Sequence, residues 1–375
     1  MPNLSSKKDP STFPLNHIVE IGVDKFKYCI PSGHVDGLLD TFLQEQFERI
    51  KSKPGTHSLS AQGKAFRNRL HVPVGEDLVL IECEPNKTTY PWAATVEFNP
   101  NPYLRKGDKA VAYLRSFFRF LFGHEASRLL SQAVVSMLHV NIDYDINPLE
   151  GTLVEAKGKR SGAKVLYNFD GHGVLGSLYV GVLHSDRRLC IYNKAAEVLH
   201  RELGPRANRV LAALASDKWD IEVGKLRETL DKQDRWRLEV RCEPDKAIPV
   251  SNIASLATCF EGIRFLQLPP EEGLFNTSLG RLFIANARND GINVALRPLD
   301  QNERRQFNRA ISRLPDVEWF SAELLLDAIT QTIEKLAPLF AVPKRRLNLA
   351  STGTSGSAHE KQSIRDEPRG RWSRL

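Results

Sequence analysis

The sequence lacks closely spaced cysteines. Its five cysteines are scattered over 375 residues, and no two of them form a Cys-x-x-Cys pair. Disulfide frameworks and structural zinc sites both need cysteines at short, regular spacings. The cysteine pattern therefore argues against either class of scaffold and predicts buried free thiols.

Long apolar runs are also missing. No run reaches the roughly 18 residues that a membrane-spanning helix needs. The polar stretch Met1–Asp9 lacks the apolar segment of a secretion signal. We therefore expect no membrane partner and a cytoplasmic location.

Acidic residues are the minority charge. The chain has 45 Asp and Glu against 52 Lys and Arg, a net charge of +7. From Lys344 onward, eight basic and three acidic residues supply +5 of that charge, in a Ser-, Gly- and Thr-rich stretch that cannot fold alone. A basic excess at one end is typical of a protein that binds nucleic acid and releases counterions, although solubility alone also explains a mildly basic chain.

Hydrophobic periodicity predicts an α+β fold. The order strand, helix, strands, helix occurs twice, and the sequence at Ile81–Pro85 resembles that at Val240–Pro244. We expect an internally duplicated antiparallel sheet with helices on one face, then a helical C-terminal region and a disordered basic tail. The predicted divisions are a disordered leader 1–15, an N-terminal half 16–130, a second half 131–248 with the candidate reactive groups, a helical region 249–343 and a flexible basic tail 344–375.

The expected elements follow from the same patterns. Strands are expected at His17–Asp24, Arg69–Val74, Leu78–Glu84, Ala93–Phe98, Val134–Asp145 and Arg235–Pro244. Helices are expected at Val35–Ile50, Ala110–Phe122, Asn193–Leu203, 206–232, Ile253–Leu266, Asn302–Leu314 and Ser321–Leu339, and a loop at Gly151–Gly162.

A row of polar residues alternates with apolar ones in the strand that ends at Asp145. The side chains of His139, Asn141, Asp143 and Asp145 point to one face, because successive residues of a strand face opposite sides. Such a row either faces solvent on an edge strand or lines a site. A row of carboxylates and an imidazole suits a hard divalent cation such as Mg²⁺ or Mn²⁺.

A second charged strand places Arg235, Arg237, Glu239, Arg241 and Glu243 on one face. Glu239 is the candidate metal-binding carboxylate of this strand. A ladder of cross-strand ion pairs is the structural alternative.

A hairpin precedes that strand. An apolar run, Leu178–Leu183, ends at a polar turn and resumes as Leu189–Tyr192, before a helix-like pattern starts at Asn193. Tyr192 therefore falls where a strand meets a helix, next to Lys194. A phenol with its ordinary pKa of about 10 is a poor nucleophile, but a nearby cation or metal favours the phenolate, which can attack a phosphodiester. A strand with a half-buried tyrosine is the structural alternative.

These patterns resemble the signature of rolling-circle replication initiators of the plasmid and filamentous-phage type. The Tyr-x-Gly…Ser…Arg-x-x-x-Tyr-Asn/Asp-Lys-x-x-Glu block is matched by Tyr179, Gly181, Ser185, Arg188, Tyr192, Asn193, Lys194 and Glu197. The Arg-x-Glu-x-Arg block of the same family is matched by Arg237, Glu239 and Arg241. The family usually has an acid where His139 stands.

The resemblance implies an enzyme that nicks and rejoins one DNA strand. A divalent cation, Mg²⁺ or Mn²⁺, held by Asp143 and Glu239 with His139 or Asp145, would polarise the scissile phosphate. Tyr192 would attack it, leaving a 5′-phosphotyrosine and a free 3′-hydroxyl, with Lys194 stabilising the phenolate or the transition state. DNA contacts are expected from Arg188, Arg235, Arg237, Arg241, Arg304 and Arg305.

The implied partners are an origin in double-stranded DNA with a single-stranded or hairpin nick site, a host helicase and a second copy of the chain, in a bacterial cytoplasm. Tyr179 is the rival nucleophile, and the arginine-rich helix is either a solvated face or a DNA contact. Two other functions remain open: a DNA-binding regulator of this fold that does not cleave, and a nickase of transposition or conjugative transfer.

Overall fold

The computed structural model describes residues 16–34, 37–75, 77–156, 163–168, 175–181, 187–195, 197, 235–270 and 272–340. The predicted leader and basic tail lie outside these residues, as do the turn of the predicted hairpin and most of the two helices expected at Asn193–Leu203 and 206–232.

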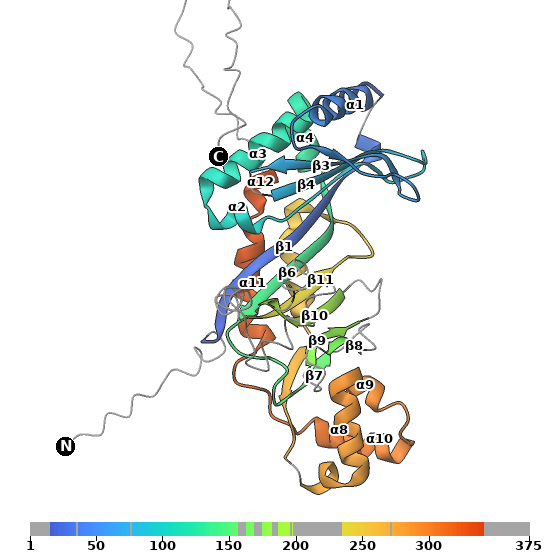
Figure 1. The fold of residues 1–375 in the computed structure, drawn as a ribbon, viewed down its shortest axis with the longest axis vertical. Helices are drawn as coiled ribbons and strands as arrows, with labels where there is room; N and C mark the ends of the chain where they lie inside the picture. The colour runs from blue at the N-terminus through green and yellow to red at the C-terminus, as the bar shows by residue number, and fades with distance from the viewer. Residues whose placement is uncertain are drawn as a thin grey trace, which may run out of the picture.

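One long antiparallel sheet, whose strands differ in length, runs through the molecule (Figure 1). Its strands stand in the order β2-β3-β4-β5-β1-β6-β11-β10-β9-β8, and β12 also pairs with β6. The bounds are β1 Ile18–Pro31, β2 His57–Ser58, β3 Phe66–Val74, β4 Asp77–Pro85, β5 Trp92–Phe98, β6 Val134–Tyr144, β8 Ala163–Asn168, β9 Leu175–Val180, β10 Arg187–Asn193, β11 Trp236–Cys242 and β12 Ile248–Pro249.

The strand order is symmetrical about the central β1–β6 pair. On each side, the last long strand of the half pairs with the first, so that β5 flanks β1 and β11 flanks β6. An internal duplication would produce this order.

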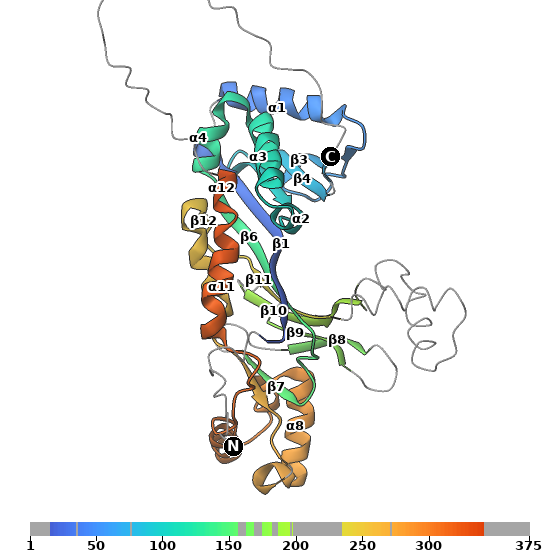
Figure 2. The same cartoon turned by 90° about the vertical axis from the view of Figure 1, so that its left-hand side faces the viewer.

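Alternation along the strands gives the sheet one apolar face. Leu138, Val140 and Ile142 on β6 are fully buried, as are Leu238 and Val240 on β11. Helices cover this face and share a single hydrophobic core with it, as Figure 2 shows for α11 and α12 beside β1 and β6. The helices of this layer are α1 Gly37–Lys51, α2 Asn101–Arg105, α3 Asp108–Phe122, α4 Ala126–Ser131, α11 Ala322–Glu334 and α12 Ala337–Phe340, with the 3₁₀ segments η2 Ser32–His34, η3 Gly123–Glu125 and η5 Val250–Phe260.

A separate helical lobe lies at one end of the molecule, below the small β7–β13 sheet (Figure 1). It has its own hydrophobic core, in which the rings of Phe283 and Phe307 lie 4.4 Å apart. Its elements are β7 Thr152–Ala156, β13 Ile263–Gln267, η6 Gly273–Asn276, α8 Ser278–Asp290, α9 Ile292–Ala295 and α10 Gln301–Ile311.

The structure confirms the expected mixture of helices and antiparallel sheet, and most expected strands and helices within the described residues appear with shifted ends. Ser321 is the N-cap of α11, where its side chain accepts a hydrogen bond from the backbone N–H of Leu324. Two expectations are wrong. The predicted helix Ile253–Leu266 is instead η5 followed by strand β13, because Gly262 turns the chain at a φ of +75°. The predicted loop Gly151–Gly162 contains strand β7, which pairs with β13.

Among the described residues, no helix combines the length and apolar character that crossing a lipid bilayer requires.

Replacing a leucine by alanine should destabilise the protein to different extents on the two faces of the sheet. Leu238→Ala empties a fully buried position and should lower the free energy of unfolding by about 2 to 5 kcal/mol. Leu78→Ala, on a strand position that is 51% exposed, should change it by less than about 0.5 kcal/mol. Urea denaturation of both variants measures the difference, and equal losses would contradict the assignment of the core.

Candidate functional site

The second face of the sheet carries polar residues from four strands. Register places Asn141, Glu239, Cys190 and Tyr179 side by side across β6, β11, β10 and β9. The neighbouring row is Asp143, Arg237, Tyr192 and Ser177. Directly opposed residues of neighbouring strands share a face, so residues far apart in sequence meet in one cluster.

Tyr192 and Glu239 are in direct contact at the centre of this cluster. The hydroxyl of Tyr192 donates a hydrogen bond to Oε2 of Glu239 over 2.9 Å. The other oxygen of Glu239 accepts from Nε of Arg241 at 2.6 Å and lies 3.1 Å from Nδ1 of His139. Tyr192 and Glu239 are 8% and 4% exposed, so the contact is shielded from water.

The protonation of this pair depends on burial and on neighbouring charges. Burial, and then the negative charge of Glu239, raise the pKa of Tyr192 well above its ordinary value, although Arg237 opposes the shift. Burial also disfavours the charged form of Glu239, but His139 and Arg241 outweigh it and hold the pKa of Glu239 well below its ordinary value. Both shifts favour a neutral phenol beside a charged carboxylate. Stabilisation of a phenolate by a cation or a bound metal stays a prediction.

Arg237 connects the two halves of the sheet. Its guanidinium donates two hydrogen bonds to Asp143, at 2.6 and 2.7 Å, and a third to Asp24 on β1. Arg237 is 4% exposed and Asp143 is 3% exposed. This bidentate geometry uses both oxygens of Asp143. Arg237 is thus an internal cation that neutralises two acids, and its burial argues against the direct DNA contact that the sequence predicts.

Asn101, the first residue of α2, supports the same cluster. Its side-chain oxygen accepts from the backbone N–H of Val23 at 2.7 Å, and its amide donates to Asp24 at 2.9 Å. Gly22 makes room for this side chain, because a Cβ atom there would lie 2.6 Å from the oxygen of Asn101. Asp24 and Asn101 are site residues that sequence reasoning missed. The only sequence signal was an acid at the end of an alternating strand.

The expected cation site does not fit this arrangement. Asp143 is fully occupied by Arg237, and Glu239 by Tyr192, His139 and Arg241. Within the described residues, no three side chains of His, Cys, Asp or Glu are placed to hold a metal ion together. One donor does fit: Nε2 of His139 is buried without a hydrogen-bond partner, while Nδ1 faces a carboxylate, as in many metal-binding histidines.

The remaining predicted residues of the sheet lie around this centre. Arg188 stands directly opposite Arg241 across β10 and β11, and its Nε atom is buried without a hydrogen-bond partner. Nζ of Lys194 lies 5.9 Å from the ring centre of Tyr192 and binds Glu197 at 2.8 Å. Asp145 is outside the cluster, beyond the end of β6, where it binds His17 at 2.9 Å.

Four further predicted residues lie away from the contact between Tyr192 and Glu239. Arg235 precedes β11 and its carbonyl accepts from the backbone N–H of Lys194. Arg304 and Arg305 are on α10, in the separate helical lobe, and Arg304 donates to the backbone carbonyls of Leu299 and Arg297. Tyr179, the rival nucleophile, lies beneath the guanidinium of Arg241, which is 5.9 Å from its ring centre.

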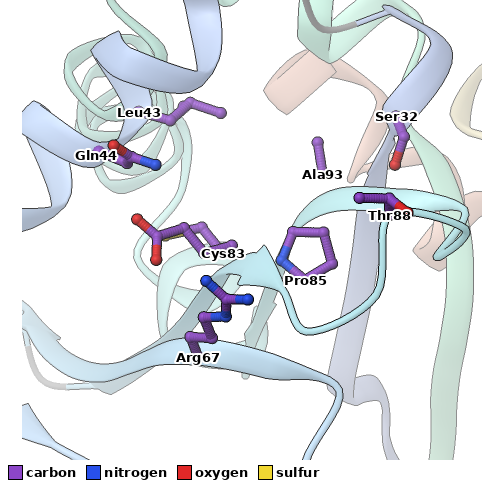
Figure 3. A pocket seen from close by; sticks show the side chains of 9 residues that line it. Ser32, Leu43, Gln44, Arg67, Cys83, Pro85, Thr88 and Ala93 are labelled. Atoms are coloured by element: carbon purple, nitrogen blue, oxygen red, sulfur yellow. The ribbon is translucent and has the colours of Figure 1, made fainter. Parts of the chain in front are cut away.

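A cavity of about 380 Å³ lies in the N-terminal half, away from these residues (Figure 3). Arg67, Cys83 and Gln44 are among its lining residues, and Glu84 beside them has the unusual φ of +57°. None of the predicted site residues lines it.

Few known proteins resemble the chain. No model of a protein family matches the chain, and no curated protein matches it. Among solved structures, the chain is similar to a rolling circle replication initiator protein from Geobacillus stearothermophilus, with 17% sequence identity and a TM-score of 0.36, over 68% of this chain and 89% of that one. A likeness this distant carries no argument about the site.

Arg237 should be essential for the stability of the cluster. Arg237→Met leaves the buried Asp143 and the partly buried Asp24 without their cation and should lower the free energy of unfolding by about 3 to 5 kcal/mol at pH 7. Burial already raises the pKa of Asp24, and losing Arg237 raises it further. Asp24 in the folded variant then binds a proton that it lacks in the unfolded chain at the same pH. The loss of unfolding free energy relative to the wild type should therefore be smaller at pH 5 than at pH 7.

Arg237→Lys is the matched control, because it keeps the charge and loses the bidentate geometry; it should fall between the wild type and Arg237→Met. Denaturant unfolding at the two pH values measures both variants. If the loss of unfolding free energy caused by Arg237→Met is unchanged or larger at pH 5, the electrostatic explanation is contradicted.

Proposed function

We propose that the protein nicks and rejoins one strand of DNA through a covalent phosphotyrosine at Tyr192, in the initiation of rolling-circle replication. The observation that carries the proposal is the 2.9 Å hydrogen bond from the Tyr192 hydroxyl to Glu239. It pairs a candidate nucleophile with a candidate base, as nucleophilic catalysis requires. The rolling-circle role rests on the resemblance of the two sequence blocks.

In the proposed reaction, the Tyr192 oxygen attacks the scissile phosphorus while its proton passes to Oε2 of Glu239. The phosphorus–oxygen bond to the 3′ oxygen breaks, that oxygen takes up a proton from solvent water, and Glu239 returns its proton to solvent. The products are a 5′-phosphotyrosine and a free 3′-hydroxyl. The phosphodiester bond energy is conserved in the tyrosyl ester, so attack by a 3′-hydroxyl reverses the reaction and rejoins the strand.

Two arginines support a phosphate site beside Glu239, the residue that binds Tyr192. Arg188 and Arg241 are directly opposed, and like charges in such a position repel each other unless an anion separates them. A phosphodiester between them would compete with Glu239 for Arg241. If Arg241 turns partly toward the phosphodiester, the pKa of Glu239 rises, because Arg241 is one of the groups that lower it. DNA binding would thus make Glu239 a stronger base when it is needed.

The partners and the cofactor remain proposals. The substrate is an origin in duplex DNA with a single-stranded or hairpin nick site, and a host helicase and a second copy of the chain are the proposed protein partners. Mg²⁺ or Mn²⁺ is proposed on the resemblance alone, and no step above uses it. Nicking after chelation, with and without added Mg²⁺ or Mn²⁺, tests this dependence.

The N-terminal half is proposed to be a copy of the second half without a nucleophile. Its row across β1, β5, β4 and β3 contains Cys29, Thr95, Glu82 and Arg69. Glu82 is bound there by Lys27 at 3.0 Å and Arg69 at 2.7 Å, so its charge is neutralised. Strand β4, which takes the place of β10, has no tyrosine. A docking or structural role suits this half.

A DNA-binding regulator that does not cleave is the second candidate. The burial of Tyr192 favours it, because a phosphate must reach a hydroxyl that is shielded in the DNA-free protein. A nickase of transposition or conjugative transfer would use the same tyrosine and differ in its DNA substrate.

Tyr192→Phe should abolish nicking of supercoiled DNA that carries the cognate origin, because it removes only the attacking oxygen. Tyr179→Phe, the matched control, should nick at the wild-type rate. A gel assay for open-circular DNA, with Mg²⁺ or Mn²⁺ present, measures both, and binding should survive in both variants.

Other outcomes distinguish the candidates. Loss of nicking in Tyr179→Phe with activity retained in Tyr192→Phe would move the nucleophile to Tyr179. Tight origin binding by the wild type without cleavage in either metal would favour the regulator.

A further inference from the structure

The outer face of α10 carries a stripe of arginines that the proposed nicking site does not use. Helix α10 packs onto its lobe through Phe307 and Ile311, which are both buried. With 3.6 residues per turn, Asn302, Arg305 and Arg309 project from the side opposite Phe307. Arg313 follows on the same side just beyond the helix. All four are exposed.

The charged residues of α10 divide into two groups. Asp300 and Glu303 form a capping box, in which each side chain accepts the other's backbone N–H, at 2.8 and 2.9 Å. Arg304 donates to the carbonyls of Leu299 and Arg297 and so holds the preceding loop. Asp300, Glu303 and Arg304 thus have structural roles within the lobe. In the part of the chain that the structure describes, Arg305, Arg309 and Arg313 make no ion pair.

No acid lies on the stripe, which is flanked by Gln306 and Ser312. Arginine, asparagine and glutamine are the side chains that bind the edges of guanine and adenine in pairs of hydrogen bonds. The helix has 11 residues and is therefore about 16 Å long, the length of about five base pairs. Figures 1 and 2 show the lobe at the end of the molecule, below β7, and Figure 1 shows α10 at the side of the lobe, beside α8.

We propose that α10 enters the major groove of duplex DNA and reads its bases through Asn302, Arg305 and Arg309. The groove is about 12 Å wide and admits one helix. The lobe has its own hydrophobic core and packs beneath the β7–β13 sheet, so α10 is a rigid support for these side chains. Sequence recognition in the duplex is then separate from the chemistry on the large sheet.

The test uses the full chain with Tyr192→Phe, so that binding is measured without cleavage. A selection from random duplex DNA gives the preferred sequence, and fluorescence anisotropy compares that duplex with a scrambled one. Arg305→Ala with Arg309→Ala should weaken binding to the selected duplex at least about 30-fold, since each paired contact to a base contributes about 1 to 3 kcal/mol. Binding to the scrambled duplex should weaken far less.

Arg281→Ala with Arg288→Ala is the matched control, because it removes the same charge from α8 of the same lobe. It should leave the ratio of the two affinities unchanged, and neither double variant should alter thermal unfolding, since all four arginines are exposed. Selection of no sequence by the parent protein would overturn the proposal. Equal losses on both duplexes after changing Arg305 and Arg309 would also overturn it, because they would show phosphate contact without base reading. These results are independent of whether Tyr192 cleaves DNA.

Discussion

The bonds from Arg237 to Asp143 and Asp24 are the interaction on which the rest of the site depends. They connect three neighbouring strands, β11, β6 and β1, and therefore both halves of the sheet. A buried charge is tolerated only with its partners, and removing one partner is strongly destabilising. The cluster must therefore assemble as a whole. Asn101 and the missing side chain of Gly22 complete it by fixing Asp24.

This balance of charge determines the state of Tyr192. Arg237 lowers the pKa of the phenol, but burial and Glu239 raise it more. The phenol is therefore held by its hydrogen bond to Glu239 in a surrounding that favours its neutral, weakly nucleophilic form. An anion that draws Arg241 away from Glu239 would change this surrounding, because the same arginine both lowers the pKa of Glu239 and faces Arg188 across the strands.

Alternation made the polar face of the sheet predictable, and tertiary pairing made the details unpredictable. The period of two placed His139 and Asp143 on one face of β6 and Glu239 on one face of β11, and strand pairing brings these faces together with Tyr192. Asp145, predicted in the same row, lies outside the cluster. Periodicity cannot say which cation neutralises which acid, so Arg237 was predicted to contact DNA. Periodicity also cannot say which strands pair with each other. Asp24 joins the site because β1 lies beside β6. The predicted helix at Ile253–Leu266 failed because a single glycine separates two patterns of different period.

The charges of the site argue for a second DNA contact elsewhere. The cations of the cluster are Arg188, Lys194, Arg237 and Arg241, and its acids are Asp24, Asp143, Glu197 and Glu239. Equal numbers of opposite charges close together produce little field at a distance, so under the proposed function the cluster itself would attract DNA weakly. Affinity for a polyanion would then have to come from charges that are not neutralised, and the exposed arginines of α10 are charges of this kind. If both proposals hold, recognition by the lobe raises the local concentration of DNA at the cluster around Tyr192.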